Sequence, residues 1–181
     1  MKLLANFVVL LVLPCIAVAS GEDLPQSLSV AGKTLYLNGS GYRKATFFKI
    51  KVYRAALYLE KKSHNPEEII NSKETKRLVM KFVRSVSKKR LQSGWRDGFR
   101  KNAEDYFAIE QQIKAFNQMM PDVSDGDTIV LTWTNGDTVT VTINGKKTGE
   151  IKNSNFARAI MAIWLGKNPP NQDLKEGLLG K

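Results

Sequence analysis

The stretch TIVLTWTNGDTVTVTINGKKTGEIK, residues 128–152, constrains the fold of this chain more than any other segment. Its β-branched and aromatic residues alternate with polar ones, and Asn-Gly interrupts the alternation twice, at 135–136 and 144–145. Asn-Gly between alternating segments is typical of two-residue hairpin turns, because both central residues of such a turn adopt a positive φ. The segment therefore predicts a three-stranded antiparallel meander.

The remaining elements follow from periodicity and from capping residues. Strands are predicted around residues 35–37, 48–59 and 76–86, and helices from Asn65, over 87–106 and 109–120, after a cap at Ser154 or Asn155, and from Asp173. Both faces of 55–59 are apolar, which predicts a bulge or a strand buried on both sides. Gly94 and Gly98 lie beside the apolar stripe of the 87–106 helix and predict close approach by another backbone or a ligand. The sum is an α+β fold with a mostly antiparallel sheet and helices on one face.

The N-terminus has the pattern of a signal peptide. Lys2 precedes an apolar run from Phe7 to Ala19, and Ala17-Val18-Ala19 has the small-x-small form that signal peptidase accepts. We expect cleavage after Ala19, which makes 1–19 a signal peptide and 20–181 a single domain exported to the periplasm or secreted. An uncleaved anchor or a lipoprotein acylated at Cys15 are the alternatives. Cleavage removes the only cysteine.

Positive charge is concentrated in one part of the chain. Residues 43–101 contain 18 Lys or Arg against 5 Asp or Glu. An exported protein with such a segment meets anionic lipid, polyanionic envelope polymers or acidic ligands rather than nucleic acid. A solvated basic face is the other interpretation.

Common catalytic and metal-binding patterns are missing from the sequence. His64 is the only histidine and lies in a polar segment, so we expect a surface residue rather than a base or a metal ligand. DVSDGD, at 122–127, lacks the spacing of a calcium loop and predicts a turn. GSG, at 39–41, lacks the third glycine and the following helix of a dinucleotide site, which favours a bend or a close approach in a strand. We expect neither a cofactor nor a metal.

Three segments together resemble one known family. They are LNGSGYRKATFFKIKVYRAALYLEKK, LQSGWRDGFRKNAEDYF and SNFARAIMAIWLGKNPPNQDLKEGLLG, and the whole is similar to the chalcone isomerase-like family, in particular its secreted bacterial branch. The resemblance implies an open-faced β-sandwich with a ligand cleft between the large sheet and its helices. This family includes plant chalcone isomerases and fatty-acid-binding relatives without isomerase chemistry.

The resemblance also implies a set of cleft residues. Arg43 matches the arginine that holds a phenolate or enolate in the enzymes and a carboxylate in the binding proteins, and Asn102 matches the cleft asparagine. Trp95 falls where the enzymes have a tyrosine, Tyr53 loosely where they have a threonine, and Ile163 where they have a threonine or serine. Hydroxyls that complete the enzyme site are therefore missing, which makes the implied cleft more apolar.

We expect a monomeric, non-catalytic binding protein for a fatty acid or similar apolar carboxylate, with Arg43 as the anion anchor. A divergent isomerase or intramolecular lyase is one alternative, and a basic envelope protein that docks on anionic lipid or a partner protein is another. Single residues also keep alternatives: Arg43 as a surface or structural salt bridge, Trp95 as core, and Asn102 as a link between helix and sheet.

Overall fold

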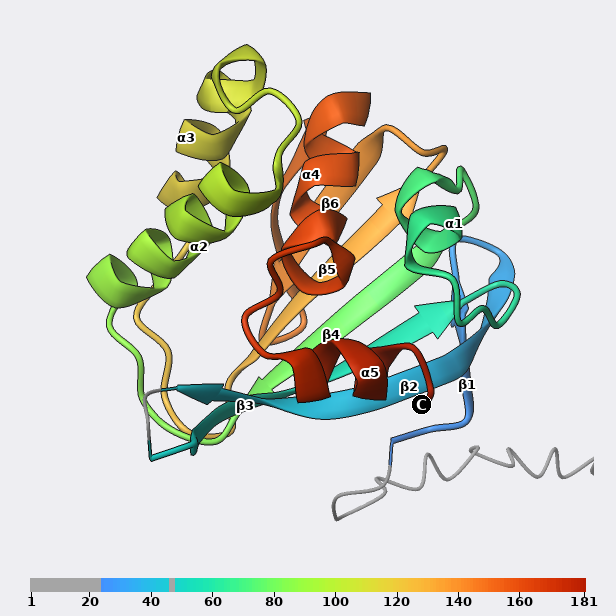
Figure 1. Cartoon of the computed structure of the whole chain (residues 1–181), viewed down its shortest axis with the longest axis horizontal. Coiled ribbons are helices and arrows are strands. Elements are labelled where there is room, and N and C mark those ends of the chain that lie inside the picture. The colour runs from blue at the N-terminus through green and yellow to red at the C-terminus, as the bar shows by residue number, and fades with distance from the viewer. Residues whose placement is uncertain (1–23, 46–47) are drawn as a thin grey trace, which may run out of the picture.

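The computed structural model describes residues 24–45 and 48–181, so the predicted signal peptide at 1–19 lies outside the described residues. The strands are β1 Ser27–Val30, β2 Lys33–Ala45, β3 Ile50–Leu59, β4 Lys76–Phe82, β5 Thr128–Thr134, β6 Thr138–Ile143 and β7 Lys146–Lys152; the helices are α1 Pro66–Asn71, α2 Lys88–Asn102, the 3₁₀ turn η1 Phe107–Ile109, α3 Glu110–Gln118, α4 Ser154–Leu165 and α5 Gln172–Leu178. Figure 1 shows the helices gathered on one side of a curved sheet.

The sheet has seven strands in the order of the sequence, and each strand pairs antiparallel with its sequence neighbours. The predicted meander is confirmed as β5, β6 and β7. Its two turns have a positive φ at both residues, 56° and 76° at Asn135-Gly136 and 48° and 79° at Asn144-Gly145. The Asn-Gly pairs therefore fix the register of this half of the sheet.

Strand β3 is buried on both faces where the sequence predicts it. Ala55, Leu57 and Leu59 belong to the main core under the helices, whereas Ala56 and Tyr58 belong to a smaller cluster on the other face, with Val30 and Leu35. The pairing with β2 is irregular at two places: Asn38 of β2 is an extra residue opposite Leu57 and Tyr58, and Val52 is an extra residue of β3 itself. Strand β3 is therefore buried on both faces because the main core covers one face and residues of β1 and β2 cover the other.

Most helix boundaries follow local signals, with two corrections. Helix α1 begins after Asn65, whose Oδ1 accepts hydrogen bonds from the Glu67 and Glu68 amides at 3.0 and 3.3 Å. The cap of α4 is Asn153, whose Oδ1 accepts from the Phe156 amide at 2.9 Å, so the predicted cap at Ser154 or Asn155 is wrong by one or two residues. Helix α2 ends at Asn102, and Tyr106 lies beyond it rather than on its stripe.

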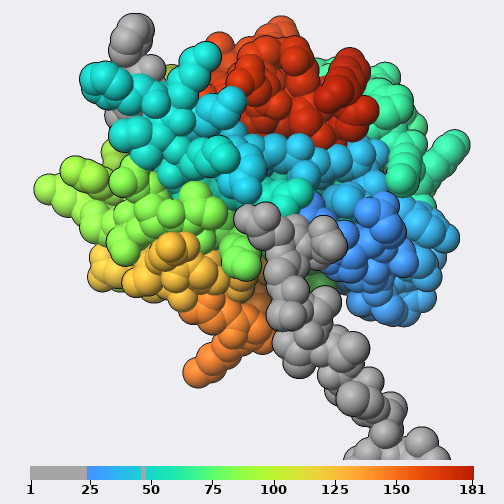
Figure 2. All heavy atoms as spheres, turned by 90° about the horizontal axis from the view of Figure 1, so that it is seen from below, coloured from blue at the N-terminus to red at the C-terminus, as the bar shows by residue number. Residues whose placement is uncertain are grey.

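The last helix packs directly on β2, at the glycines that the sequence analysis singled out. A Cβ placed at Gly39 would lie 2.1 Å from the carbonyl oxygen of Gly177, and one at Gly41 would lie 3.2 Å from a Leu174 methyl carbon. In Figure 2 the C-terminal segment lies against the strands of the N-terminal half. The glycines of β2 therefore allow a backbone-to-backbone approach, as predicted.

Within the described part of the chain, no helix is long and apolar enough to span a membrane. The same residues contain no group of three or more His, Cys, Asp or Glu placed to hold a metal ion. The segment 122–127 forms a turn in which the Ser124 amide donates to Asp127 at 2.7 Å.

Candidate ligand-binding cleft

Arg43 and Tyr53 are direct partners across β2 and β3. Opposite residues of an antiparallel pair point to the same face, and both side chains line the cleft under the helices. The adjacent pair, Tyr42 and Arg54, faces the other way, with the Arg54 guanidinium 6.0 Å from the centre of the Tyr42 ring. The strand pleat therefore separates one arginine inside the cleft from another outside it.

A bulge at Val52 adjusts this register. Arg43 pairs with Tyr53, but Lys44 pairs with Lys51, which leaves Val52 as the extra residue of β3. A bulge bends its strand and re-aims the neighbouring side chains. Here it lies next to Tyr53, at the mouth of the cleft.

The guanidinium of Arg43 is held by backbone and amide groups. Its Nη1 donates to the Lys44 carbonyl oxygen and to Asn171 Oδ1, the latter at 3.1 Å. Asn171 also accepts from the Lys44 amide at 2.8 Å and donates to the Lys44 carbonyl at 2.9 Å. No carboxylate in the described residues forms an ion pair with Arg43. The half-buried guanidinium is thus oriented by neutral partners and keeps its positive charge uncompensated in the cleft.

Tyr53 adds a second donor beside Arg43. Its hydroxyl oxygen accepts a hydrogen bond from Trp164 Nε1 at 3.1 Å. Burial raises the pKa of the Tyr53 hydroxyl, while the Trp164 hydrogen bond and the Arg43 charge partly lower it. The phenol is therefore protonated at neutral pH, and its proton meets no acceptor among the described residues.

The cleft itself has a volume of about 660 Å³. Its walls are strands β2–β4, helix α2, the end of α4 and the loop that leads to α5. Four of the five predicted residues line it: Arg43, Tyr53, Trp95 and Ile163. The apolar lining that the sequence did not single out as ligand-contacting comprises Ile50, Val52, Phe82, Val86, Leu91, Trp164, Pro169 and Pro170.

Trp95 is both a core residue and a wall of the cleft. Its side chain is only 6% exposed and stacks edge-on against Phe116 and Trp164, with ring centres 4.9 and 5.4 Å apart. Its indole nitrogen is buried without a hydrogen-bond partner in the described residues. Trp95 is therefore a core residue whose side chain also lines the cleft.

The glycines of α2 have different surroundings. A Cβ at Gly98 would lie 2.9 Å from Ile163 Cγ2 and 3.2 Å from its Cγ1 and Cδ1. A Cβ at Gly94 would meet no atom within 4 Å, and Gly94 lines the cleft. Gly98 thus lets α2 approach α4, whereas Gly94 leaves space open on the ligand side.

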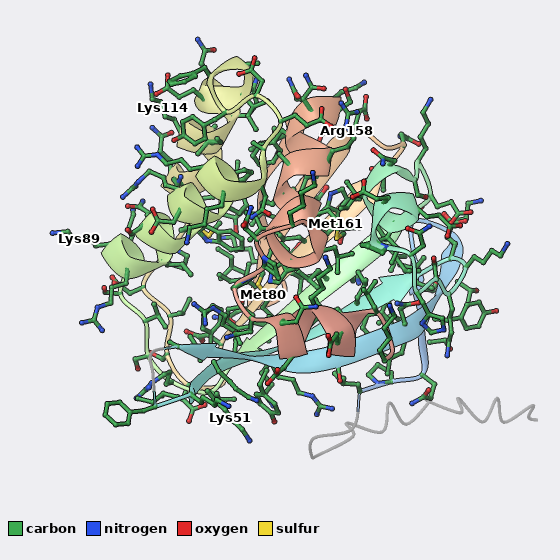
Figure 3. The ribbon with its side chains drawn as sticks, in the orientation of Figure 1. Lys51, Met80, Lys89, Lys114, Arg158 and Met161 are labelled. Carbon is green, nitrogen blue, oxygen red and sulfur yellow. The ribbon has the colours of Figure 1, made fainter. Side chains whose placement is uncertain are left out.

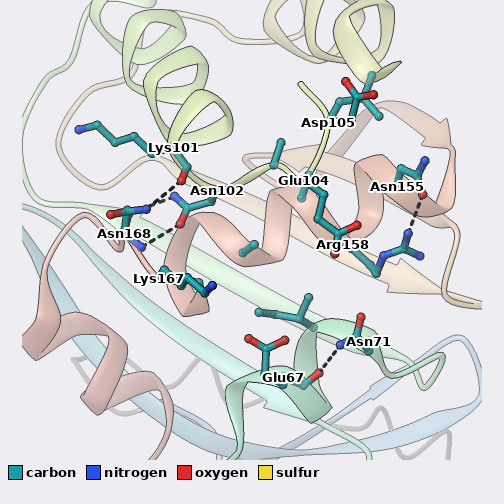
Figure 4. A pocket seen from close by; sticks show the side chains of 16 residues that line it. Glu67, Asn71, Lys101, Asn102, Glu104, Asp105, Asn155, Arg158, Lys167 and Asn168 are labelled. Carbon is teal, nitrogen blue, oxygen red and sulfur yellow. Dashed lines mark hydrogen bonds between the residues drawn. The ribbon is translucent and has the colours of Figure 1, made fainter. Parts of the chain in front are cut away.

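Asn102 is the predicted residue that does not line the cleft. Its amide nitrogen donates to the Gly98 and Asn168 carbonyls at 3.0 Å each, and its Oδ1 accepts from the Asn168 amide at 3.0 Å. Figure 4 shows the bonds between Asn102 and Asn168 at the edge of a second, polar pocket of about 560 Å³. Asn102 therefore ties the end of α2 to the loop after α4 and acts on the cleft only through that loop.

The rim of the cleft is cationic. Arg84, Arg90 and Lys101 are exposed lining residues, against one lining acid, Asp97. None of these three cations forms a salt bridge within the described residues. An anion that approaches the opening meets a favourable potential.

A family model described as chalcone isomerase-like matches residues 17–180. The chain belongs to the chalcone isomerase-like family. The recognised family is therefore confirmed, and so is the predicted fold, a curled antiparallel sheet with helices packed on it.

Among solved structures, an Arabidopsis thaliana fatty-acid binding protein of this family's fold is similar to the chain. The TM-score is 0.70 at 17% sequence identity, over 86% of this chain and 90% of that chain. A search of curated proteins finds no match. At this identity the likeness shows a shared fold.

In this chalcone isomerase-like chain, two cleft positions carry side chains without hydroxyls. Trp95 has a buried indole N–H in place of a hydroxyl, and Ile163 has only an alkyl side chain, which packs over Gly98. Polar groups of the cleft lining near these two residues include the Arg43 guanidinium and the Tyr53 hydroxyl, which accepts from Trp164 Nε1. The arrangement suits one oxyanion and an apolar body behind it.

Proposed function

We propose that this protein is an exported, non-catalytic binding protein for a long-chain fatty acid or a similar apolar carboxylate. The observation that carries the proposal is the Arg43–Tyr53 pair: an uncompensated guanidinium and a protonated phenol side by side in a cleft with mainly apolar walls. A carboxylate takes charge-assisted hydrogen bonds from arginine, and a phenol can donate a further one.

Two further facts support binding without turnover. An isomerase of this family needs donors where negative charge develops, and loss of one such donor typically costs about 100- to 1,000-fold in rate. Trp95 and Ile163 supply no hydroxyl at two of those positions. The fatty-acid binding protein with the same fold is a precedent for a binding role.

The test is a titration with a fluorescent long-chain fatty acid and with its methyl ester. Arg43→Gln keeps most of the side-chain length and removes the charge. Because a hydrogen bond to a charged group contributes roughly 1.5–3 kcal/mol, affinity for the acid should fall about 10- to 150-fold. Affinity for the ester should change little, because the ester carries no charge for Arg43 to neutralise.

Arg54→Gln is the matched control. It removes the same charge from the opposite face of the sheet, where Arg54 lies near the Tyr42 ring and donates to Ser40 Oγ at 3.4 Å. Circular dichroism confirms that each variant is folded. Equal affinities in all three proteins would reduce Arg43 to an ordinary charge, and absence of binding by the wild type would remove the fatty-acid proposal.

We also propose the secreted bacterial branch of the family, a monomer, and cleavage after Ala19. The pattern Ala17-Val18-Ala19 supports the cleavage site. Intact mass of the exported protein should correspond to a chain that begins at Ser20. A species that retains Met1, or an acylated Cys15, would contradict export as a free protein.

A further inference from the structure

Three exposed apolar residues lie on or next to the strands that border the cleft. Phe48, Ile50 and Val83 are 82%, 39% and 37% exposed, and they form most of the exposed large hydrophobic residues in the described chain. Ile50 lines the cleft directly. The Val83 amide donates to the Val52 carbonyl at 3.0 Å, so the end of β4 continues beside the start of β3. Phe48 precedes β3 by two positions, so the three exposed residues lie on adjoining backbone segments, which we call the rim.

Cations surround these apolar residues. The segments 43–51 and 83–90 each contain four Lys or Arg and no Asp or Glu. Figures 1 and 2 place the β2–β3 hairpin and the segment leading into α2 on the same side of the molecule. Figure 3 shows Lys89 projecting outward from the start of α2 and Lys51 projecting from the hairpin.

The start of α2 contradicts the usual preference of helices. Its first turn contains Lys88, Lys89 and Arg90 and no acid, at the positive end of the helix dipole. Cations there destabilise the helix, whereas acids stabilise it. The one acid at this end comes from another segment: Asp122 Oδ1 accepts from the Lys88 amide at 2.7 Å, so it offsets part of the charge of the three cations. A local choice that opposes folding is typical of a functional surface.

We propose that this rim docks on the surface of an anionic lipid bilayer. Lysines and arginines near a membrane gain from its negative surface potential, and exposed aromatic and aliphatic side chains gain by entering the headgroup region. The rim combines the two. Of the cations in its two segments, Lys44 pairs with Asp173 at 2.9 Å, and the others leave an excess of positive charge that complements anionic lipid. Docking would turn the open cleft towards the bilayer; passage of a fatty acid between the two is a consequence that rests on the proposed function.

The first test is flotation of the full chain with phosphatidylcholine vesicles, with and without phosphatidylglycerol. The wild-type protein should bind the anionic vesicles, and this binding should disappear at high salt, because salt screens the attraction between surface charges. Lys88→Glu/Lys89→Glu should weaken binding by about tenfold or more. The variant should also melt at a higher temperature, since acids now lie at the start of α2.

The control makes the same change of charge elsewhere. Lys61→Glu/Lys62→Glu reverses two adjacent, exposed lysines just beyond the other end of β3. It should bind vesicles much more strongly than the Lys88/Lys89 variant. If both variants lose binding equally, net charge alone is responsible and the docking surface is wrong.

A second pair of variants tests the apolar part. Phe48→Ser should weaken vesicle binding several-fold, whereas Phe107→Ser, at a residue with a similar 85% exposure, should leave it unchanged. Equal loss of vesicle binding in Phe48→Ser and Phe107→Ser would overturn the proposal. The proposal would also fail if the wild-type protein bound acidic proteins but no vesicles. Lys88 and Lys89 do not line the cleft, so the fatty-acid titration in solution stays a separate result. Failure of docking and failure of ligand binding are therefore distinguishable.

Discussion

The distance between α2 and α4 depends on the missing side chain of Gly98, and this can be measured. Gly→Ala in the middle of a helix stabilises a protein by about 0.5–1 kcal/mol when nothing opposes it. Gly94 meets that condition, because a Cβ there has no atom within 4 Å. We therefore expect Gly94→Ala to raise the free energy of unfolding by about 0.5–1 kcal/mol.

Gly98→Ala should have the opposite sign. Its Cβ would lie 2.9–3.2 Å from three carbons of Ile163, so the whole Ile163 side chain must move within a packed core. Inserting a methyl group into such a core costs about 1–3 kcal/mol, which exceeds the gain in helix propensity. Gly98→Ala should therefore be less stable than Gly94→Ala by about 1–3 kcal/mol.

Urea unfolding followed by fluorescence of the buried tryptophans measures both values. The decisive experiment is a double-mutant cycle with Ile163→Ala, which removes the three carbons that Gly98→Ala would contact. In that background Gly98→Ala should become about as favourable as Gly94→Ala, with a coupling energy of about 1–3 kcal/mol. Equal stabilities of Gly94→Ala and Gly98→Ala without Ile163→Ala would refute the argument.

Three more predictions concern charge and chemistry. Burial lowers the pKa of Lys76 from its ordinary 10.5 to about 8. As pH rises, the folded state therefore releases this proton before the unfolded state does. Between pH 8 and 10.5 the free energy of unfolding of wild type should rise by about 3 kcal/mol relative to that of Lys76→Met. If urea unfolding gave the same pH dependence of stability for both proteins, this reasoning would be contradicted. Arg43→Gln should raise the pKa of Tyr53 further, because it removes a charge that lowers it; absorbance titration of the phenolate, assigned with Tyr53→Phe, checks the direction. Naringenin chalcone should not cyclise above background, because Trp95 and Ile163 supply no hydroxyl, and robust ring closure in an absorbance assay would oppose that reasoning.

Local signals in the sequence predict much of the fold. The Asn-Gly turns, the Asn65 cap and the alternation of β4 act over a few residues, so they could be read without tertiary information. The cap of α4 could not, because 153–155 reads Asn-Ser-Asn and each of these residues is a good cap. Asn153 is the cap because the tertiary structure, rather than the local sequence, sets where α4 begins.

The cleft was harder to predict than the fold. Neither periodicity nor spacing pairs Arg43 with Tyr53, since their register depends on the bulge at Val52. Asn171 orients Arg43 from 128 positions away, and no local pattern signals such a contact. Trp164 was missed because every residue of 159–165 is apolar, so the sequence of this part of α4 cannot tell which residue lines the cleft.

The order of the strands has a consequence for how the protein is made. Every strand pairs with a sequence neighbour, which keeps most contacts of the sheet local and favours rapid folding; the long connection is 83–127, between β4 and β5, which contains α2 and α3. The cleft depends on a distant contact instead, because the Asn171 side chain donates to the carbonyl oxygen of Lys44, 127 positions away in the sequence and next to Arg43. Truncation of residues 171–181 would therefore leave all seven strands in the chain but remove the Asn171 side chain that orients Arg43. The orientation of Arg43 in β2 thus depends on a residue of the C-terminal segment, whereas the pairing of β2 does not.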